Sequence, residues 1–181
     1  FFVNLEKKDP TPSSSQGVIV AGTTTQSGSD TLPGQSGYIQ KEDSLVVEKI
    51  GVDAPLVQSP SDSSDDIEKT LKTGVMIYPT SDLPSENGVT VVLGHTAPDN
   101  WPKINYYGIF NRVDELQKGD EIKVYFRNRE YIYTVSRQFL VKPGADLVPS
   151  SDLTNSENVL FLSTCWPPNS GTSRIIIEAY R

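Results

Sequence analysis

The sequence holds one cysteine, Cys165, and one histidine, His95, in 181 residues. A single cysteine cannot form an intramolecular disulfide, and one cysteine with one histidine cannot make a zinc site without several carboxylates. Cys165 is therefore a buried hydrophobic side chain, a covalent link to a partner, or a reactive thiol. Taken alone, the count of cysteines favours the first interpretation.

Positive charge and long apolar runs are also scarce. The formal net charge is −7, the pI is about 4.7, and the Lys and Arg residues are scattered. This charge argues against a nucleic-acid partner, because no basic field exists to release counterions from a phosphate backbone. No run of 18 apolar residues is present, which predicts no membrane span within this sequence. The apolar start at residues 1–3 fits either the outer end of a removed membrane segment or an arbitrary fragment boundary.

Composition divides the chain into two parts. Residues 1–44 are rich in Ser, Thr, Gly, Pro and Gln, and they predict a flexible N-terminal tether because they bury too little apolar surface to offset ordering. Residues 45–181 have the length of one domain. We therefore expect one folded domain that follows a tether.

Short apolar segments bounded by turn residues predict a mostly β domain. One or two short helices are expected, from one or two helical turns at 64–71 and a short helix carrying Phe110, Val113 and Leu116 at three-residue spacing. Gly51 and Pro55 are interpreted as strand breaks. Because eight strands with few helices hide their edges best by closing, we expect a closed, antiparallel-rich barrel. The expected strands cover residues 45–50, 54–57, 75–78, 89–93, 121–126, 131–141, 159–165 and 174–180.

The histidine and the cysteine each follow an apolar run, at Val91-Val92-Leu93-Gly94-His95 and Val159-Leu160-Phe161-Leu162-Ser163-Thr164-Cys165. A thiol attacks as the thiolate, and an imidazole is the usual group that generates or stabilises the thiolate. If these two strand ends meet in the fold, the chain is a cysteine enzyme.

Arg174 is the third candidate. The loop 166–173 is short enough for a hairpin, and opposed residues of an antiparallel pair have a constant index sum, so Cys165 is expected opposite Arg174. The guanidinium would then stabilise the thiolate and donate to an oxyanion. The alternative is a solvated charge at a strand end.

Taken together, His95, Cys165 and Arg174 resemble the catalytic set of the sortases, cysteine transpeptidases of the Gram-positive-type cell surface. The family signature Thr-Leu-X-Thr-Cys is matched by Phe161-Leu162-Ser163-Thr164-Cys165, except at Phe161. The resemblance covers about residues 45–181. It extends in consistent order over Lys49-Ile50-Gly51-Val52-Asp53-Ala54-Pro55, Leu71-Lys72-Thr73-Gly74-Val75, Leu83-Pro84-Ser85-Glu86-Asn87-Gly88 and Lys118-Gly119-Asp120-Glu121-Ile122.

The resemblance implies an eight-stranded sortase-type β-barrel and a thioacyl-enzyme mechanism. Cys165 would attack a Leu-Pro-X-Thr-Gly-like sorting signal of a surface protein, His95 would transfer protons, and Arg174 would position the substrate and stabilise the oxyanion. The amine acceptor would be a lipid-linked peptidoglycan precursor or a pilin lysine. The family also implies a place on the extracellular face of the cell membrane, anchored by an N-terminal segment absent from this sequence.

Further residues are assigned by their position relative to the family pattern. The loop 142–158 matches the signal-recognition loop of sortases, and Cys-X-Pro is closer to classes D, E and C than to class A. The sequence predicts no required cofactor, and a non-essential Ca²⁺ on Asp146, Asp152 and Glu157 is less favoured than a solvated acidic surface. The substrate-binding candidates are Thr164, Val141, Ala145, Leu147, Val148 and Trp166.

Three alternatives remain open at this stage. An L,D-transpeptidase also uses His, Cys and Arg, but its Arg lies close to a Gly-Cys pair, which this chain lacks. A non-enzymatic surface β-domain with an incidental cysteine is the second. The third concerns the tether, where Leu32-Pro33-Gly34-Gln35-Ser36-Gly37 resembles a sorting signal and would act as a lid over the groove.

Overall fold

The computed structural model describes residues 40–98, 100–102, 104–151, 158–168 and 170–181. The predicted tether lies outside the described residues except for its last five, and so does the lid-like segment within it.

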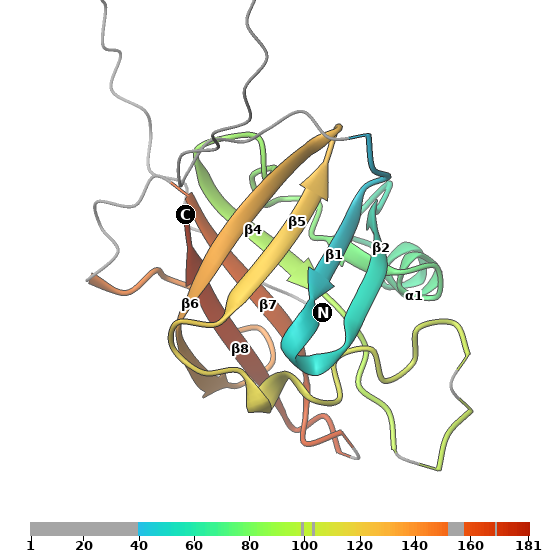
Figure 1. Cartoon of the computed structure of the whole chain (residues 1–181). Coiled ribbons are helices and arrows are strands. Elements are labelled where there is room, and N and C mark those ends of the chain that lie inside the picture. Colours follow the sequence, from blue (N-terminus) through green and yellow to red (C-terminus); the bar gives the residue numbers. More distant parts are fainter. Residues whose placement is uncertain (1–39, 99, 103, 152–157, 169) are drawn as a thin grey trace, which may run out of the picture.

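Eight strands form a closed barrel (Figure 1) in the order β1-β2-β3-β4-β7-β8-β6-β5. The pairs β2–β3 and β4–β7 are parallel, and the other pairs are antiparallel. This confirms the predicted mostly β, eight-stranded barrel. The elements are β1 (Ser44–Val47), η1 (Glu48–Ile50), β2 (Val52–Gln58), α1 (Ser64–Leu71), β3 (Val75–Ile77), β4 (Gly88–Leu93), η2 (Val113–Glu115), β5 (Glu121–Phe126), β6 (Arg129–Val141), β7 (Asn158–Trp166) and β8 (Ser173–Tyr180).

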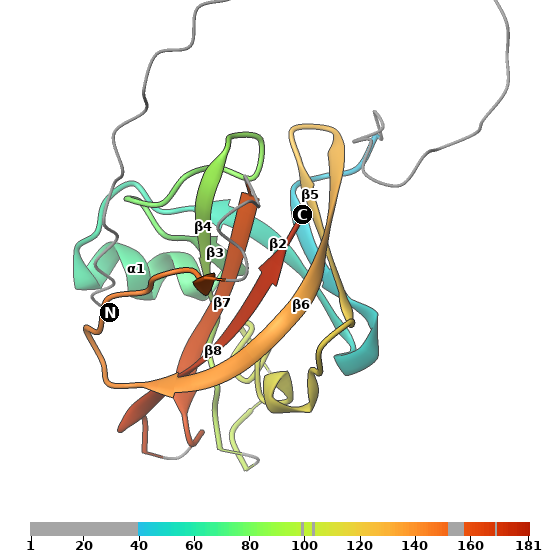
Figure 2. The same ribbon diagram turned by 90° about the vertical axis from the view of Figure 1, so that its left-hand side faces the viewer.

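Two apolar clusters lie on opposite faces of the barrel wall. Inside the barrel, alternate side chains such as Leu160 and Leu162 of β7 and Ile177 of β8 are almost completely buried. Outside it, α1 packs on the wall beside β3 and β4 (Figure 2), with Ile67 and Leu71 buried against the outward side chains of the strands. The outer cluster exists because one amphipathic helix covers that face.

At residues 110–116, after β4, a short helix was expected, and the helical part that forms is the three-residue 3-10 helix η2. The physical reason is the spacing, because Phe110, Val113 and Leu116 recur every third residue, which suits three residues per turn. The three apolar side chains were nevertheless correctly placed on one face, since all of them are buried in the core inside the barrel.

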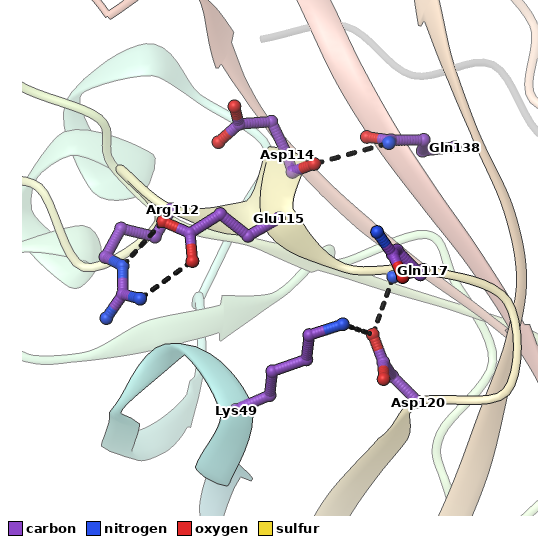
Figure 3. Close-up of polar contacts among 7 residues, drawn as sticks. All are labelled: Lys49, Arg112, Asp114, Glu115, Gln117, Asp120 and Gln138. Carbon is purple, nitrogen blue, oxygen red and sulfur yellow. Dashed lines mark hydrogen bonds and ion pairs between the residues drawn. The ribbon is translucent and has the colours of Figure 1, made fainter.

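Polar contacts hold this segment across the end of the barrel (Figure 3). Asp120 accepts from the Lys49 ammonium at 2.6 Å and from the Gln117 backbone N–H at 2.6 Å. Gln138 of β6 donates to the Asp114 carbonyl at 3.3 Å. The chain that leads away from β4 is therefore attached to η1 and to β6.

The predicted break at Pro55 is wrong, because Pro55 lies within β2. The next residue, Leu56, donates its N–H toward β1, to the Asp43 carbonyl at 2.9 Å. The proline nitrogen therefore points toward β3, whose pairing with β2 begins only at Leu56 and Val75. Since no ladder bond is needed there, a proline is tolerated.

Candidate active site

Strand register brings the three predicted catalytic residues into one row. β7 and β8 pair Cys165 with Arg174, which confirms the predicted register. β4 and β7 run parallel with a constant offset up to Leu93 and Ser163, and the Gly94 N–H continues this ladder to the Ser163 carbonyl at 3.3 Å. Extending the same offset places His95 beside Cys165.

This row faces outward from the barrel. Side chains alternate along a strand, and Phe161 of β7 and Ile176 of β8 belong to the outer cluster. Cys165 and Arg174 have the same parity as those two residues, so they lie on the outer face. Val141 of β6 pairs with Arg174 and extends the row to a third strand.

Two threonine hydroxyls tie the β4 end to the β7 end. Thr164 Oγ1 donates to the Gly94 carbonyl at 2.8 Å, and Thr96 Oγ1 donates to the Cys165 carbonyl at 2.7 Å. The two bonds flank the histidine in sequence, one before it and one after it. They fix the backbone of His95 relative to that of Cys165, which is the condition for a defined contact between the two side chains.

Cys165 is half-buried, and the β7–β8 loop lies over it. A Cβ atom placed on Gly171 would lie 3.7 Å from the Cys165 Sγ, so the loop backbone lies next to the thiol. Gly171 also has a φ of +58°, a conformation that glycine adopts at low cost. The positive φ is therefore what favours a glycine here, since a Cβ atom 3.7 Å from the sulfur would be an ordinary van der Waals contact.

Arg174 contacts the same loop. Its Nη1 donates to the Gly171 carbonyl at 2.9 Å and to the Ser173 carbonyl at 3.0 Å. These bonds hold the guanidinium beside the loop that covers Cys165. The structure places Arg174 on the same face of the sheet as the thiol. The electrostatic role expected for its guanidinium stays a prediction.

His95 is enclosed by α1 and by the segment after β4. Its side chain is 12% exposed, its ring centroid is 5.2 Å from that of Tyr107, and its Nε2 is 3.7 Å from Glu68 Oε2. Burial lowers the pKa of His95 below its ordinary value; the Glu68 carboxylate opposes this effect and the Lys72 ammonium adds to it. The histidine is therefore mostly neutral at pH 7.

The predicted substrate-binding residues fall into different environments. Val141 lies on the same face as Cys165, Trp166 is half-buried against the inner core, and Ala145 is half-buried. In the loop after β6, Leu147 is 3% exposed within the outer cluster, whereas Val148 is 59% exposed. Leu147 therefore anchors the loop by packing, and Val148 is the more accessible residue. Their contacts with a substrate stay predictions.

Thr164 was also predicted to contact substrate. The whole residue is 1% exposed, and its hydroxyl donates to the Gly94 carbonyl. A contact between Thr164 and substrate stays a prediction.

A cavity lies next to the histidine end of the row, where the chain leaves β4. This cavity has a volume of about 790 Å³, and Tyr107, whose ring contacts His95, is part of its wall. Its remaining lining comes from η1 and from the segment after β4, namely Ile50, Gly51, Ala97, Pro98, Trp101, Asn105, Tyr106, Gly108, Ile109, Asn111 and Arg112.

The described residues contain neither a cluster of metal ligands nor a membrane-spanning helix. There, no three His, Cys, Asp or Glu side chains come together as a possible metal site, and Asp152 and Glu157 lie outside that part of the chain. No helix in the described ranges is long and apolar enough to cross a membrane. The expected lack of a required cofactor stays a prediction.

Sequence reasoning missed four residues around the row: Thr96, Gly171, Glu68 and Tyr107. Thr96 follows His95 directly, so adjacency was an available signal. Gly171 lies in the predicted hairpin loop, where a glycine next to a thiol was also visible. Nothing in the sequence linked Glu68 or Tyr107 to His95, because both contacts depend on how α1 and the segment after β4 fold back.

Comparisons with known proteins agree on one family. The family model of the sortase domain matches residues 45–181. Sortase D of Bacillus subtilis (strain 168) is 30% identical over 124 residues, which is 68% of this chain and 53% of that protein. The chain therefore spans about half the length of this curated relative.

Solved structures share the fold. Sortase C-1 from Actinomyces oris superposes with a TM-score of 0.60 at 23% identity, covering 77% of this chain and 72% of that chain. A lid mutant of sortase A from Corynebacterium diphtheriae gives a TM-score of 0.58 at 18% identity, covering 82% and 72%. At these identities the structures show the fold alone.

Proposed function

Because this chain belongs to the sortase family of cysteine transpeptidases, we propose that it cleaves a Leu-Pro-X-Thr-Gly-like sorting signal and transfers the acyl part to an amine. One observation carries the proposal: strand register places His95, Cys165 and Arg174 in one outward-facing row. Family membership also removes the basis for the L,D-transpeptidase and non-enzymatic alternatives.

In the first half of the reaction, Cys165 Sγ attacks the carbonyl carbon of the signal's threonine. A thioester forms as the bond to the glycine nitrogen breaks, and the His95 imidazolium gives its proton to the departing amine. Arg174 donates hydrogen bonds to the oxyanion while the carbonyl carbon is tetrahedral. Its observed contacts with the β7–β8 loop support this placement beside the thiol.

In the second half, an incoming amine attacks the thioester. Neutral His95 takes the proton of that amine, the new amide bond forms, and the Cys165 thiolate leaves. The lowered pKa of His95 means that the reactive pair of thiolate and imidazolium is a minor population at rest. The rate is therefore expected to depend on pH as a bell-shaped curve.

The partners and the location follow from the family. The donor would be a surface protein with a C-terminal sorting signal, and the acceptor a lipid-linked peptidoglycan precursor or a pilin lysine. We place the enzyme on the extracellular face of a Gram-positive-type cell membrane.

Mass spectrometry tests the proposal. The protein is mixed with a Leu-Pro-X-Thr-Gly peptide library with and without an added amine, beside Cys165→Ala and a variant lacking residues 1–44. We expect a thioacyl adduct on Cys165 that disappears when the amine is added. An alkylatable thiol that forms no adduct in either the full chain or the shortened one would overturn the proposal.

A further inference from the structure

The Nε2 atom of His95 is buried and, among the described residues, has no hydrogen-bond partner. The carboxylate next to it is that of Glu68, whose Oε2 lies 3.7 Å away. This separation is an ion-pair distance slightly longer than a hydrogen bond. Active-site hydrogen bonds are often long without substrate and shorten in the complex. The Glu68 side chain is 47% exposed, so a small movement of it can bring Oε2 within hydrogen-bond distance of His95 Nε2.

Glu68 is held near His95 by the packing of α1. Ile67 and Leu71 are 1% and 0% exposed in the outer cluster, and Ser63 caps the helix by accepting the Asp66 N–H at 3.2 Å. The helix therefore has a defined rotation about its axis. This rotation, rather than a loop conformation, brings Glu68 to the histidine.

We propose that Glu68 is a positioning residue for His95: it accepts the Nε2–H of the imidazole, which leaves Nδ1 as the nitrogen that exchanges a proton during the reaction. This inference rests on the proposed function, but its first test does not. Nε2 keeps its proton throughout, so the proton that Nδ1 takes from the acceptor amine is the one it later gives to a departing amine. A carboxylate that binds the second ring nitrogen of a histidine fixes both the tautomer and the ring orientation.

Lys72 opposes this effect from the next turn of α1. Its Nζ lies 3.6 Å from Glu68 Oε1, so the two carboxylate oxygens face a lysine and a histidine. Among the described residues, the Tyr107 ring contacts the imidazole, and the strand register places Cys165 and Arg174 in the same row. Glu68 favours the protonated imidazole and Lys72 disfavours it. Removing the Glu68 charge should therefore lower the pKa of His95, and removing the Lys72 charge should raise it.

Nuclear magnetic resonance of the imidazole is the first test, and it needs no substrate. Since His95 is the only histidine in the sequence, its ring signals are unambiguous. Glu68→Gln should lower the pKa of His95 and reduce the Nε2–H tautomer seen in ¹⁵N shifts, whereas Lys72→Gln should raise the pKa. Asp65→Asn and Lys69→Gln are the matched controls. They remove one negative and one positive charge from exposed positions of α1 and should leave the pKa of His95 unchanged.

Kinetics supply the second test. In Glu68→Gln the acidic limb of the pH profile should shift to lower pH and the maximum of kcat/KM should fall about two- to fivefold, the range of a partly exposed ion pair. Lys72→Gln should shift the same limb to higher pH. A merely structural role for Glu68 would lower the maximum without moving the limb.

The outcomes separate the two proposals. If His95 titrates alike in the wild type, Glu68→Gln and Lys72→Gln, the positioning role is overturned even if transpeptidation is observed. If the titrations move in opposite directions but no thioacyl adduct forms, the positioning role stands and the proposed reaction is wrong.

Discussion

The side chains of β7 point alternately to the inner and the outer face of the barrel wall, and the two faces have different surroundings. Leu160 and Leu162 face a barrel interior that is closed by apolar side chains, while Phe161 and Cys165 face outward. The outer face is only partly covered, by α1 and the β6–β7 loop, and it ends in the row that holds Cys165. A thiol in the interior would be unreachable and one on an uncovered strand would be surrounded by water. The strand therefore buries apolar side chains on both faces and offers its nucleophile at the end of the outer one.

Replacement of Cys165, on the outer face, should have the largest effect on activity. In Cys165→Ala the thioacyl adduct and all amine transfer should be lost, because no other side chain can form the thioester. The free energy of unfolding should stay within about 1 kcal/mol of the wild type, since Cys165 is half-buried and only one sulfur atom is removed. Mass spectrometry of the adduct checks the loss of activity, and urea unfolding checks the free energy of unfolding. Amine transfer that survives in Cys165→Ala would contradict the assignment of the nucleophile to the outer face of β7.

Replacement of an inner residue should show the reverse pattern. Leu162→Ala should lower the free energy of unfolding by about 2–5 kcal/mol, because it leaves a cavity at a position that is 1% exposed. Activity per folded molecule should be kept. Leu140→Ala is the matched control, since Leu140 is 59% exposed and should lose less than about 0.5 kcal/mol. Equal losses in both variants would mean that burial of Leu162 inside the barrel does not set the cost of its removal.

The hydrogen bond that joins the end of β4 to the end of β7 should have an intermediate effect. Thr164→Val keeps the shape of the side chain but leaves the Gly94 carbonyl without its buried donor, at a cost of about 1–3 kcal/mol. Because the same bond fixes the β4 end, kcat/KM should also fall. Thr73→Val removes an exposed hydroxyl-to-carbonyl bond of the same kind and should change neither quantity measurably. A Thr164→Val variant with unchanged unfolding and kinetics would argue against this link.

The smallest effect concerns the pH dependence of stability. The pKa of His95 is lowered in the folded protein by burial, so the unfolded chain binds a proton more readily. The His95 contribution to the free energy of unfolding is therefore complete above about pH 6.5, the ordinary value, and is lost as pH falls through the lowered pKa. His95→Gln should remove this part of the slope in denaturant titrations. A steeper slope in the variant would show that the folded state favours the charged form.

Local pattern predicted much of the fold and of the site. The eight strands followed from apolar runs between turn residues, and the pairing of Cys165 with Arg174 followed from the length of one hairpin loop. The error at Pro55 has a tertiary origin, because the outcome depended on where β2 begins to pair with β3. At residues 110–116 the extent of the helix follows from the three-residue spacing, which suits a 3-10 turn.

The sequence by itself determined the alternation of the strands, the hairpin register and the identities of the one thiol and the one imidazole, because these depend on neighbours close in the chain. Only the tertiary structure decided that β4 and β7 run side by side, that α1 brings Glu68 to His95, and that the Gly171 backbone lies next to the sulfur. The physical reason is that these contacts join distant segments whose relative placement is set by burial of the two apolar clusters, and no local periodicity encodes that placement.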